Sequence, residues 1–431
     1  MKINYHYKNS AWFLSERAFR LFSSIVVGAW IARYLGPYDF GLLSSAQNYV
    51  ALFSSLSSMG LETILVRELI KYKYKTNEIM LSSFILILSG TALMNAVIFI
   101  SLMLVNYDST LEALIMVISL SYFFHAFYVI DYYFQSKAKG NLVLFSTITS
   151  LIISSALKII LIIISAPVIM FGLVIFFDSI VASISYTYFF KKNFILYPKK
   201  VAQLKKYLAY IIKESWPYLI SGFLICFYMK IDQVIILHLL GNYSVGQYSA
   251  AARISEAFNF IPLAILSALF PSIQSAVKFP RGLYDNKMKS IYFVFILSSI
   301  MISLVISLNA DFIISNVFGD SYKDSISILS IRIWSCVFVF IGLVSSRSLL
   351  AENLQVYALI NTFLGAAINF ILNIILIPKI GLNGAAFATI LSFAFASYFS
   401  LLIWKKTRHI FFQITFSLFS LPNIPALAYR K

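Results

Sequence analysis

The sequence predicts an all-α polytopic membrane protein with about twelve transmembrane helices arranged in two six-helix lobes. Three observations support this: the composition, the series of long apolar runs and an internal repeat. Of the 431 residues, 60% are hydrophobic and only 12% are charged, about half the charged fraction of a soluble domain. Because so apolar a chain cannot build a water-facing surface, the composition excludes a soluble enzyme, a disordered chain, a coiled coil and a nucleic-acid-binding domain.

Twelve runs are long enough to cross a bilayer, which requires about 20 mostly apolar residues. Turn and charge signals separate them, among them Gly36-Pro37 and Ala166-Pro167. The first run contains charged residues and has no short core followed by a small-residue cleavage site, so we expect an uncleaved first span. The expected spans are residues 11–34, 40–60, 79–105, 112–135, 142–165, 168–190, 216–240, 246–274, 290–310, 325–349, 355–377 and 382–404.

The basic residues gather on one side of these spans. Lys and Arg number 34 against 17 Asp and Glu, a net charge of +17. Every strongly basic connection has the same parity in the span count, so the positive-inside rule places both termini in the cytoplasm. This asymmetry explains most of the net charge without a nucleic-acid partner. The basic connections are residues 67–75, 137–139, 191–213, 278–289 and 405–408.

The expected organisation is an N-terminal lobe at 1–190, a cytoplasmic linker at 191–215, a C-terminal lobe at 216–405 and a tail at 406–431. The tail contains an apolar stretch at 410–421 that is too short to span before Pro422, so we expect an interfacial segment.

An internal repeat relates the two lobes. Within residues 31–48 and 236–253, six positions between 35 and 46 match their counterparts at a constant offset of 205. The copies lie six spans apart, and an even separation gives them the same orientation, as in transporters that bind cargo between two parallel repeats. The alternative is that both copies are simply good tight turns, in which Gly36 and Gly241 could supply a positive φ. The matched pairs are Leu35/Leu240, Gly36/Gly241, Tyr38/Tyr243, Gly41/Gly246, Ser44/Ser249 and Ala46/Ala251.

Several motifs together resemble one family over the whole chain. They are IARYLGPYDFG at 31–41, LLGNYSVGQYSAAARISE at 239–256, FGDSY at 318–322 and IPKIGLNGAAFAT at 377–389. The sequence resembles the polysaccharide flippases of the multidrug/oligosaccharidyl-lipid/polysaccharide exporter superfamily, the Wzx-type O-antigen flippases in particular. The resemblance implies a MATE-like fold. It also implies a flippase of the bacterial inner membrane that moves an undecaprenyl-pyrophosphate-linked oligosaccharide to the outer leaflet by alternating access, beside other polysaccharide assembly proteins.

Ionisable residues inside spans are costly and are functional candidates by default. A pyrophosphate cargo is an anion that basic side chains would stabilise, arginine by its planar fork and lysine as a point charge. Structural roles stay open beside this one: Arg20 could pair with Glu16, Arg253 with Glu256 and Lys158 with Asp178, while Arg332 could snorkel to the surface. The candidate pyrophosphate-binding residues are Arg20, Lys230, Arg253, Lys158 and Arg332.

Directional transport needs a coupling ion. A buried carboxylate can carry a proton or bind sodium, and Asp232, Glu256 and Asp178 are the candidates. No other cofactor is expected, because the four histidines lack ligand spacing and no nucleotide-binding or hydrolase motif occurs. We therefore expect a transporter rather than an enzyme. The alternatives are a multidrug or cation antiporter of the same superfamily, which would favour an acidic cavity, and a membrane polysaccharide polymerase or ligase, which would need a large outer loop.

Overall fold

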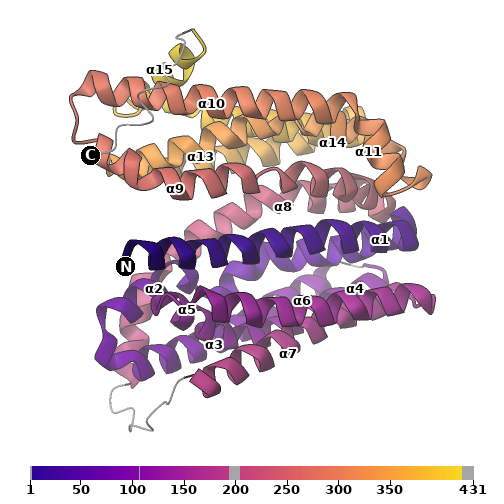
Figure 1. The fold of residues 1–431 in the computed structure, drawn as a ribbon. Coiled ribbons are helices and arrows are strands. Elements are labelled where there is room, and N and C mark those ends of the chain that lie inside the picture. Colours follow the sequence, from indigo (N-terminus) through magenta and orange to yellow (C-terminus); the bar gives the residue numbers. More distant parts are fainter. Residues whose placement is uncertain (1, 106, 194–203, 420–431) are drawn as a thin grey trace. The chain divides into compact units, whose positions relative to one another are not determined.

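The computed structural model describes residues 2–105, 107–193 and 204–419, and all regular secondary structure in these ranges is helical (Figure 1). Within them, nine helices are long and apolar enough to cross a membrane. Three of the nine, Ser15–Ser58, Leu204–Ala276 and Gln355–Leu402, are 44, 73 and 48 residues long, which is enough for two spans each. Each of the three contains a backbone break, so the predicted fold class and its twelve spans are confirmed.

The chain divides into two compact units, Met1–Lys230 and Ile231–Lys431, and each is described by itself. The predicted lobe, linker and tail boundaries stay predictions, and residues 194–203 of the linker lie outside the described residues. The first unit contains α1 (Lys2–Ser58), α2 (Leu61–Lys71), η1 (Lys73–Lys75), α3 (Thr76–Leu104), α4 (Ser109–Ser121), η2 (Tyr122–Tyr128), α5 (Val129–Ser136), α6 (Gly140–Ile163), α7 (Val168–Asn193) and the first part of α8 (Leu204–Ala257).

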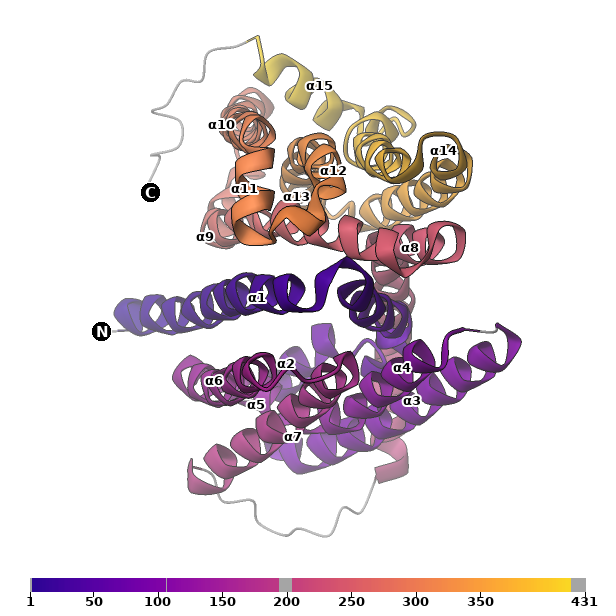
Figure 2. The ribbon, with the colours of Figure 1, turned by 90° about the vertical axis from the view of Figure 1, so that its right-hand side faces the viewer.

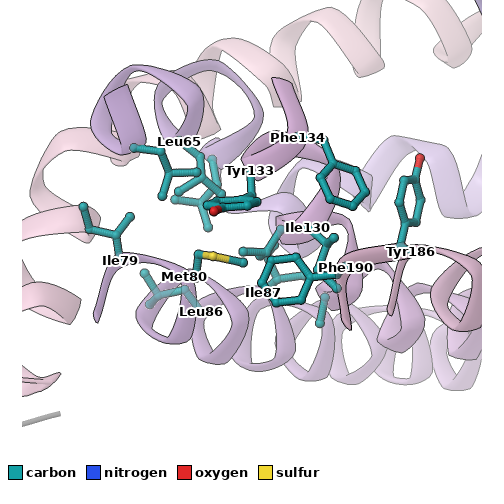
Figure 3. Close-up of a cluster of buried hydrophobic side chains, with 14 of the residues drawn as sticks. Leu65, Ile79, Met80, Leu86, Ile87, Ile130, Tyr133, Phe134, Tyr186 and Phe190 are labelled. Atoms are coloured by element: carbon teal, nitrogen blue, oxygen red, sulfur yellow. The ribbon is translucent and has the colours of Figure 1, made fainter. Parts of the chain in front are cut away.

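A buried apolar cluster fixes the interrupted fourth span of the first unit, which consists of α4, η2 and α5. Figure 3 shows part of this cluster, with Ile130 and Tyr133 of α5 facing Met80 and Ile87 of α3. Burying aliphatic and aromatic side chains on both elements holds them in register. The segment Tyr122–Tyr128, directly before α5, is thereby positioned inside the unit.

The second unit contains the rest of α8, α9 (Phe260–Ala276), α10 (Arg281–Leu308), α11 (Ala310–Val317), η3 (Asp320–Tyr322), α12 (Asp324–Arg332), α13 (Ser335–Ala351), α14 (Gln355–Ser397), η4 (Phe399–Leu402) and α15 (Arg408–Ser417). Figure 2 shows α10, α13 and α14 grouped in this unit. The short α15 packs on α10 through the buried Ile410 and Ile414. The interfacial placement of residues 410–421 stays a prediction, and residues 420–431 lie outside the described part.

The two matched turns of the repeat have the same backbone conformation. Gly36 has φ 70° and ψ 173°, and Gly241 has φ 80° and ψ 179°. This region of φ and ψ is essentially restricted to glycine. A Cβ added at either residue would meet no atom within 4 Å, so the backbone alone demands glycine. The positive φ expected from the sequence is confirmed at both positions, and the shared conformation supports the repeat.

Candidate functional site

A buried cluster of charged and hydroxyl groups lies in the second unit around Arg332, the last residue of α12. Its Nη1 donates to Ser255 Oγ at 2.6 Å, its Nε to the Tyr248 hydroxyl oxygen at 3.2 Å and its Nη2 to Glu256 Oε1 at 3.1 Å. The residue is 4% exposed. All three guanidinium nitrogens are therefore engaged, and Arg332 does not snorkel to a surface.

Asp232 completes this cluster from the first arm of α8. Its Oδ2 accepts from the Tyr248 hydroxyl at 2.6 Å and lies 3.8 Å from Arg332 Nη2, while its Oδ1 accepts from the backbone N–H of Gln233 at 2.8 Å. Ser249 Oγ likewise donates to Gln233 Oε1 at 2.8 Å. Two bonds with the same separation of 16 residues thus join the two arms of α8 across the Gly241 turn.

The cluster combines charges of both signs. One guanidinium faces the carboxylates of Asp232 and Glu256, and buried charges persist only when they are paired and hydrogen-bonded. Arg253, which is half-buried, lies within electrostatic range of Glu256 and Tyr322. The structure thus unites three residues that the sequence analysis had proposed separately, namely Arg332, Asp232 and Glu256.

The remaining candidates occupy partly paired positions in the first unit. Arg20 donates from Nε at 3.0 Å and Nη2 at 2.8 Å to the same oxygen of Glu16, the pairing left open above, and its side chain is 56% exposed. Lys158 is half-buried within electrostatic range of Asp178. Lys230, also half-buried, lies on α8 at the end of the first unit. The assigned roles of these residues stay predictions.

The first unit also contains an open cavity of about 240 Å³ beside the interrupted fourth span. The segment η2 is a 3₁₀-helix, whose three residues per turn place residues i, i+3 and i+6 in one row. Tyr122, His125 and Tyr128 form that row, with ring centroids 4.3 Å apart in the first pair and 4.7 Å in the second. The cavity is lined by Ser54, Ser57, Ser58, Leu61, Glu62, Ile87, Tyr122, His125, Tyr128 and Tyr132.

The opposite side of η2 packs into the unit. Phe124 lies edge-on to Phe176 with centroids 5.5 Å apart, and Phe127 lies edge-on to Phe84 at 5.2 Å. The phenylalanines thus anchor η2, while the tyrosines and His125 turn toward the cavity. The sequence analysis missed these residues, although the spacing Tyr122-x-x-His125-x-x-Tyr128 was visible and places polar aromatic side chains on one helix face.

Metal-ligating side chains do not gather anywhere in the described ranges: no group of three or more His, Cys, Asp or Glu residues there could hold an ion. Outside the spans, Glu352 accepts from the Tyr284 hydroxyl at 2.8 Å and lies 2.9 Å from His409 Nε2. Burial raises the pKa of Glu352, but hydrogen bonding and charge from His409 outweigh it and hold this pKa below its usual value.

The comparisons with known proteins agree with this architecture. The family model described as "Polysaccharide biosynthesis protein" matches residues 8–277. The probable low-salt glycan biosynthesis flippase Agl15 of Haloferax volcanii is 30% identical over 46% of this chain, and an uncharacterized membrane protein of Methanocaldococcus jannaschii is 26% identical over 51%. The matches span 40% and 43% of those two relatives, less than half of each.

Two solved structures share the fold over nearly the whole chain. An inward-facing multidrug resistance MATE family transporter of the MOP superfamily aligns with a TM-score of 0.68 at 14% identity, covering 94% of each chain. The lipid II flippase MurJ in an inward closed conformation aligns with a TM-score of 0.67 at 17% identity, covering 98% of this chain and 93% of its own. At such identities the likeness establishes the fold, and the substrate has to be argued from residues.

Proposed function

We propose a lipid-linked glycan as the cargo of this chain, which belongs to the polysaccharide biosynthesis protein family. The protein is a flippase that moves an undecaprenyl-pyrophosphate-linked oligosaccharide, such as an O-antigen repeat unit, from the inner to the outer leaflet of the bacterial inner membrane. The observation that carries this proposal is the family match over residues 8–277. The basic connections support cytoplasmic termini.

The exposed basic side chains suit the anionic headgroup of this cargo. Arg20 gives two of its nitrogens to one oxygen of Glu16 and keeps Nη1 without a hydrogen bond among the described residues, so a phosphate oxygen can add to the pair. Lys158, Lys230 and Arg253 are half-buried candidates for the same role. Arg332 has no free nitrogen, so we assign it to holding Asp232 and Glu256 rather than to contacting cargo.

The cluster in the second unit suits ion coupling. Two carboxylates contact one guanidinium in it, and a carboxylate can carry a proton or bind a sodium ion, which would change its contact with Arg332. Asp178 is the corresponding candidate in the first unit, where its Oδ1 is buried without a hydrogen-bond partner. We propose that an ion gradient acting on these carboxylates drives alternating access by the two lobes.

Transport into proteoliposomes tests the proposal. Purified protein is reconstituted with undecaprenyl-pyrophosphate-linked oligosaccharide, and outer-leaflet glycan is detected by its accessibility to an added glycosidase. We expect protein-dependent movement that responds to a pH or sodium gradient. Movement of cationic drugs without movement of the glycolipid would instead identify a multidrug or cation antiporter. Elongation or transfer of the glycan would identify a polymerase or ligase, and movement indifferent to both gradients would remove the coupling step.

A further inference from the structure

The cavity beside η2 contains more open hydrogen-bonding groups than the surrounding span can satisfy. The hydroxyls of Tyr122, Tyr128 and Tyr132, the ring nitrogens of His125 and the carboxylate of Glu62 make no hydrogen bond to any residue that the structure describes. Glu62 is exposed and the three tyrosines and His125 are half-buried, so these groups are accessible from the cavity, and polar groups inside a membrane span mark function. Their convergence on one cavity therefore indicates a polar ligand.

The chemistry of the lining selects the class of ligand. A pyranose ring presents apolar C–H faces that stack on aromatic rings and hydroxyls that pair with phenol, imidazole and carboxylate groups. The lining contains no arginine or lysine, and Glu62 would repel an anion. The cavity is thus unsuited to the pyrophosphate itself. Its volume of about 240 Å³ is many times the roughly 10–15 Å³ that a single water needs on the same measure, which leaves room for a ligand of the size of one sugar ring.

The neighbourhood of the cavity indicates which sugar it would take. Arg20, a candidate for the pyrophosphate, lies within electrostatic range of both His125 and Tyr128. In a polyprenyl-pyrophosphate glycan, only the first sugar is bonded directly to the phosphate. A headgroup held at Arg20 would therefore offer that sugar to the cavity.

We propose that the Tyr122–His125–Tyr128 row and Glu62 form a carbohydrate subsite for the sugar attached to the pyrophosphate. This inference rests on the proposed function for the source of the sugar. The row fixes the ring by stacking, the phenols and His125 bond its hydroxyls, and Glu62 accepts from two adjacent hydroxyls. Arg20 binds the phosphate beside it, so the two contacts recognise different parts of one headgroup.

Matched cargos and matched variants test the subsite. Equilibrium binding to the full chain in nanodiscs is measured with undecaprenyl pyrophosphate and with the same lipid carrying one N-acetylglucosamine. The variant Tyr122→Phe/Tyr128→Phe removes two hydroxyls and retains both rings. Tyr49→Phe is the matched control, because its hydroxyl donates to Ser101 in the same unit and does not line the cavity.

We expect the double variant to weaken binding of the glycosylated lipid by roughly tenfold, corresponding to two lost hydrogen bonds, and to leave the sugar-free lipid unchanged. Arg20→Ala should weaken both lipids. The subsite is overturned if the double variant binds the glycosylated lipid as the wild type does, if it weakens both lipids equally, or if wild-type protein does not distinguish the two lipids.

Two further arms separate this inference from its rivals. If the wild-type protein moves no lipid-linked glycan, the proposed function fails. Binding of free N-acetylglucosamine then tests the subsite by itself: sugar binding that the double variant loses supports the subsite, and a wild-type protein that binds no sugar overturns it.

Tetraphenylphosphonium is the cationic probe, since aromatic rings and Glu62 could also hold a cation. Binding of this probe that Glu62→Gln abolishes, without any sugar binding by the wild type, overturns the carbohydrate assignment.

Discussion

Two polar clusters, one in each unit, differ in how their groups are paired. In the second unit, every nitrogen of Arg332 and both oxygens of Asp232 have protein partners. In the first unit, the phenols of Tyr122 and Tyr128 face a cavity without protein partners among the described residues, and Arg20 is half-exposed. A fully hydrogen-bonded cluster stabilises the unit that contains it, whereas donors and acceptors without protein partners are available to bind a ligand. The comparison therefore favours the open cavity of the first unit as a place for ligand binding and the Arg332 cluster as a structural element of the second unit.

Of the predictions that test this comparison, the largest effect on stability is expected from the removal of Arg332. Arg332→Ala leaves Asp232 and Glu256 facing each other without their shared cation, and losing one partner of a buried ion pair costs about 3–5 kcal/mol. We expect a large fall in the midpoint of thermal unfolding and in the amount of protein in the membrane. Arg281→Ala, at an exposed pair with Asp285, is the control. Wild-type stability in Arg332→Ala would show that the cluster does not hold the second unit together.

The glycine turns test whether the two units share one backbone design. Gly36→Ala and Gly241→Ala each force a side chain into a glycine-only conformation, at a cost of about 1–3 kcal/mol. Because a new Cβ meets no atom within 4 Å at either site, the two costs should be equal. Gly282→Ala, where φ is ordinary and the space equally open, should be neutral or slightly stabilising. Unequal losses measured by thermal unfolding would contradict the equivalence of the two turns.

The sequence predicted the parts of this molecule that depend on local pattern. Span lengths follow from runs of apolar residues, and the turns follow from Gly36 and Gly241, so twelve spans and a matched pair of kinks could be foreseen. Glu256 was expected near Arg253 because residues three apart share a helix face. Its bond to Arg332, 76 residues away, depends on how α8 and α12 are rotated about their axes, which no local pattern fixes. The row of Tyr122, His125 and Tyr128 was missed because no local pattern showed that this segment is a 3₁₀-helix bordering a cavity.

Arg20 should separate function from stability in the first unit. The pair with Glu16 is half-exposed on the arginine side, and such pairs contribute less than about 1 kcal/mol. Arg20→Ala should therefore leave thermal unfolding nearly unchanged while lowering the rate of glycolipid movement in proteoliposomes severalfold. Arg20→Lys retains the charge without the planar guanidinium, so its rate of glycolipid movement should lie between those of the wild type and Arg20→Ala. Equal transport by all three proteins would remove Arg20 from the headgroup site and weaken the assignment of recognition to the first unit.

The smallest expected effect concerns Glu352, which lies outside the spans of the second unit and pairs with His409. The pKa of this carboxyl is held below its usual value by His409, so its bonds stabilise the folded state above the ordinary glutamate pKa and are lost as the pH falls through the lowered value. Thermal unfolding measured between neutral and acidic pH should show a loss of about 1 kcal/mol at the acidic end. Glu352→Gln should lack this component, since an amide does not titrate. An identical pH profile in the variant would show that the pairing of the carboxylate with His409 does not contribute to the stability of the second unit.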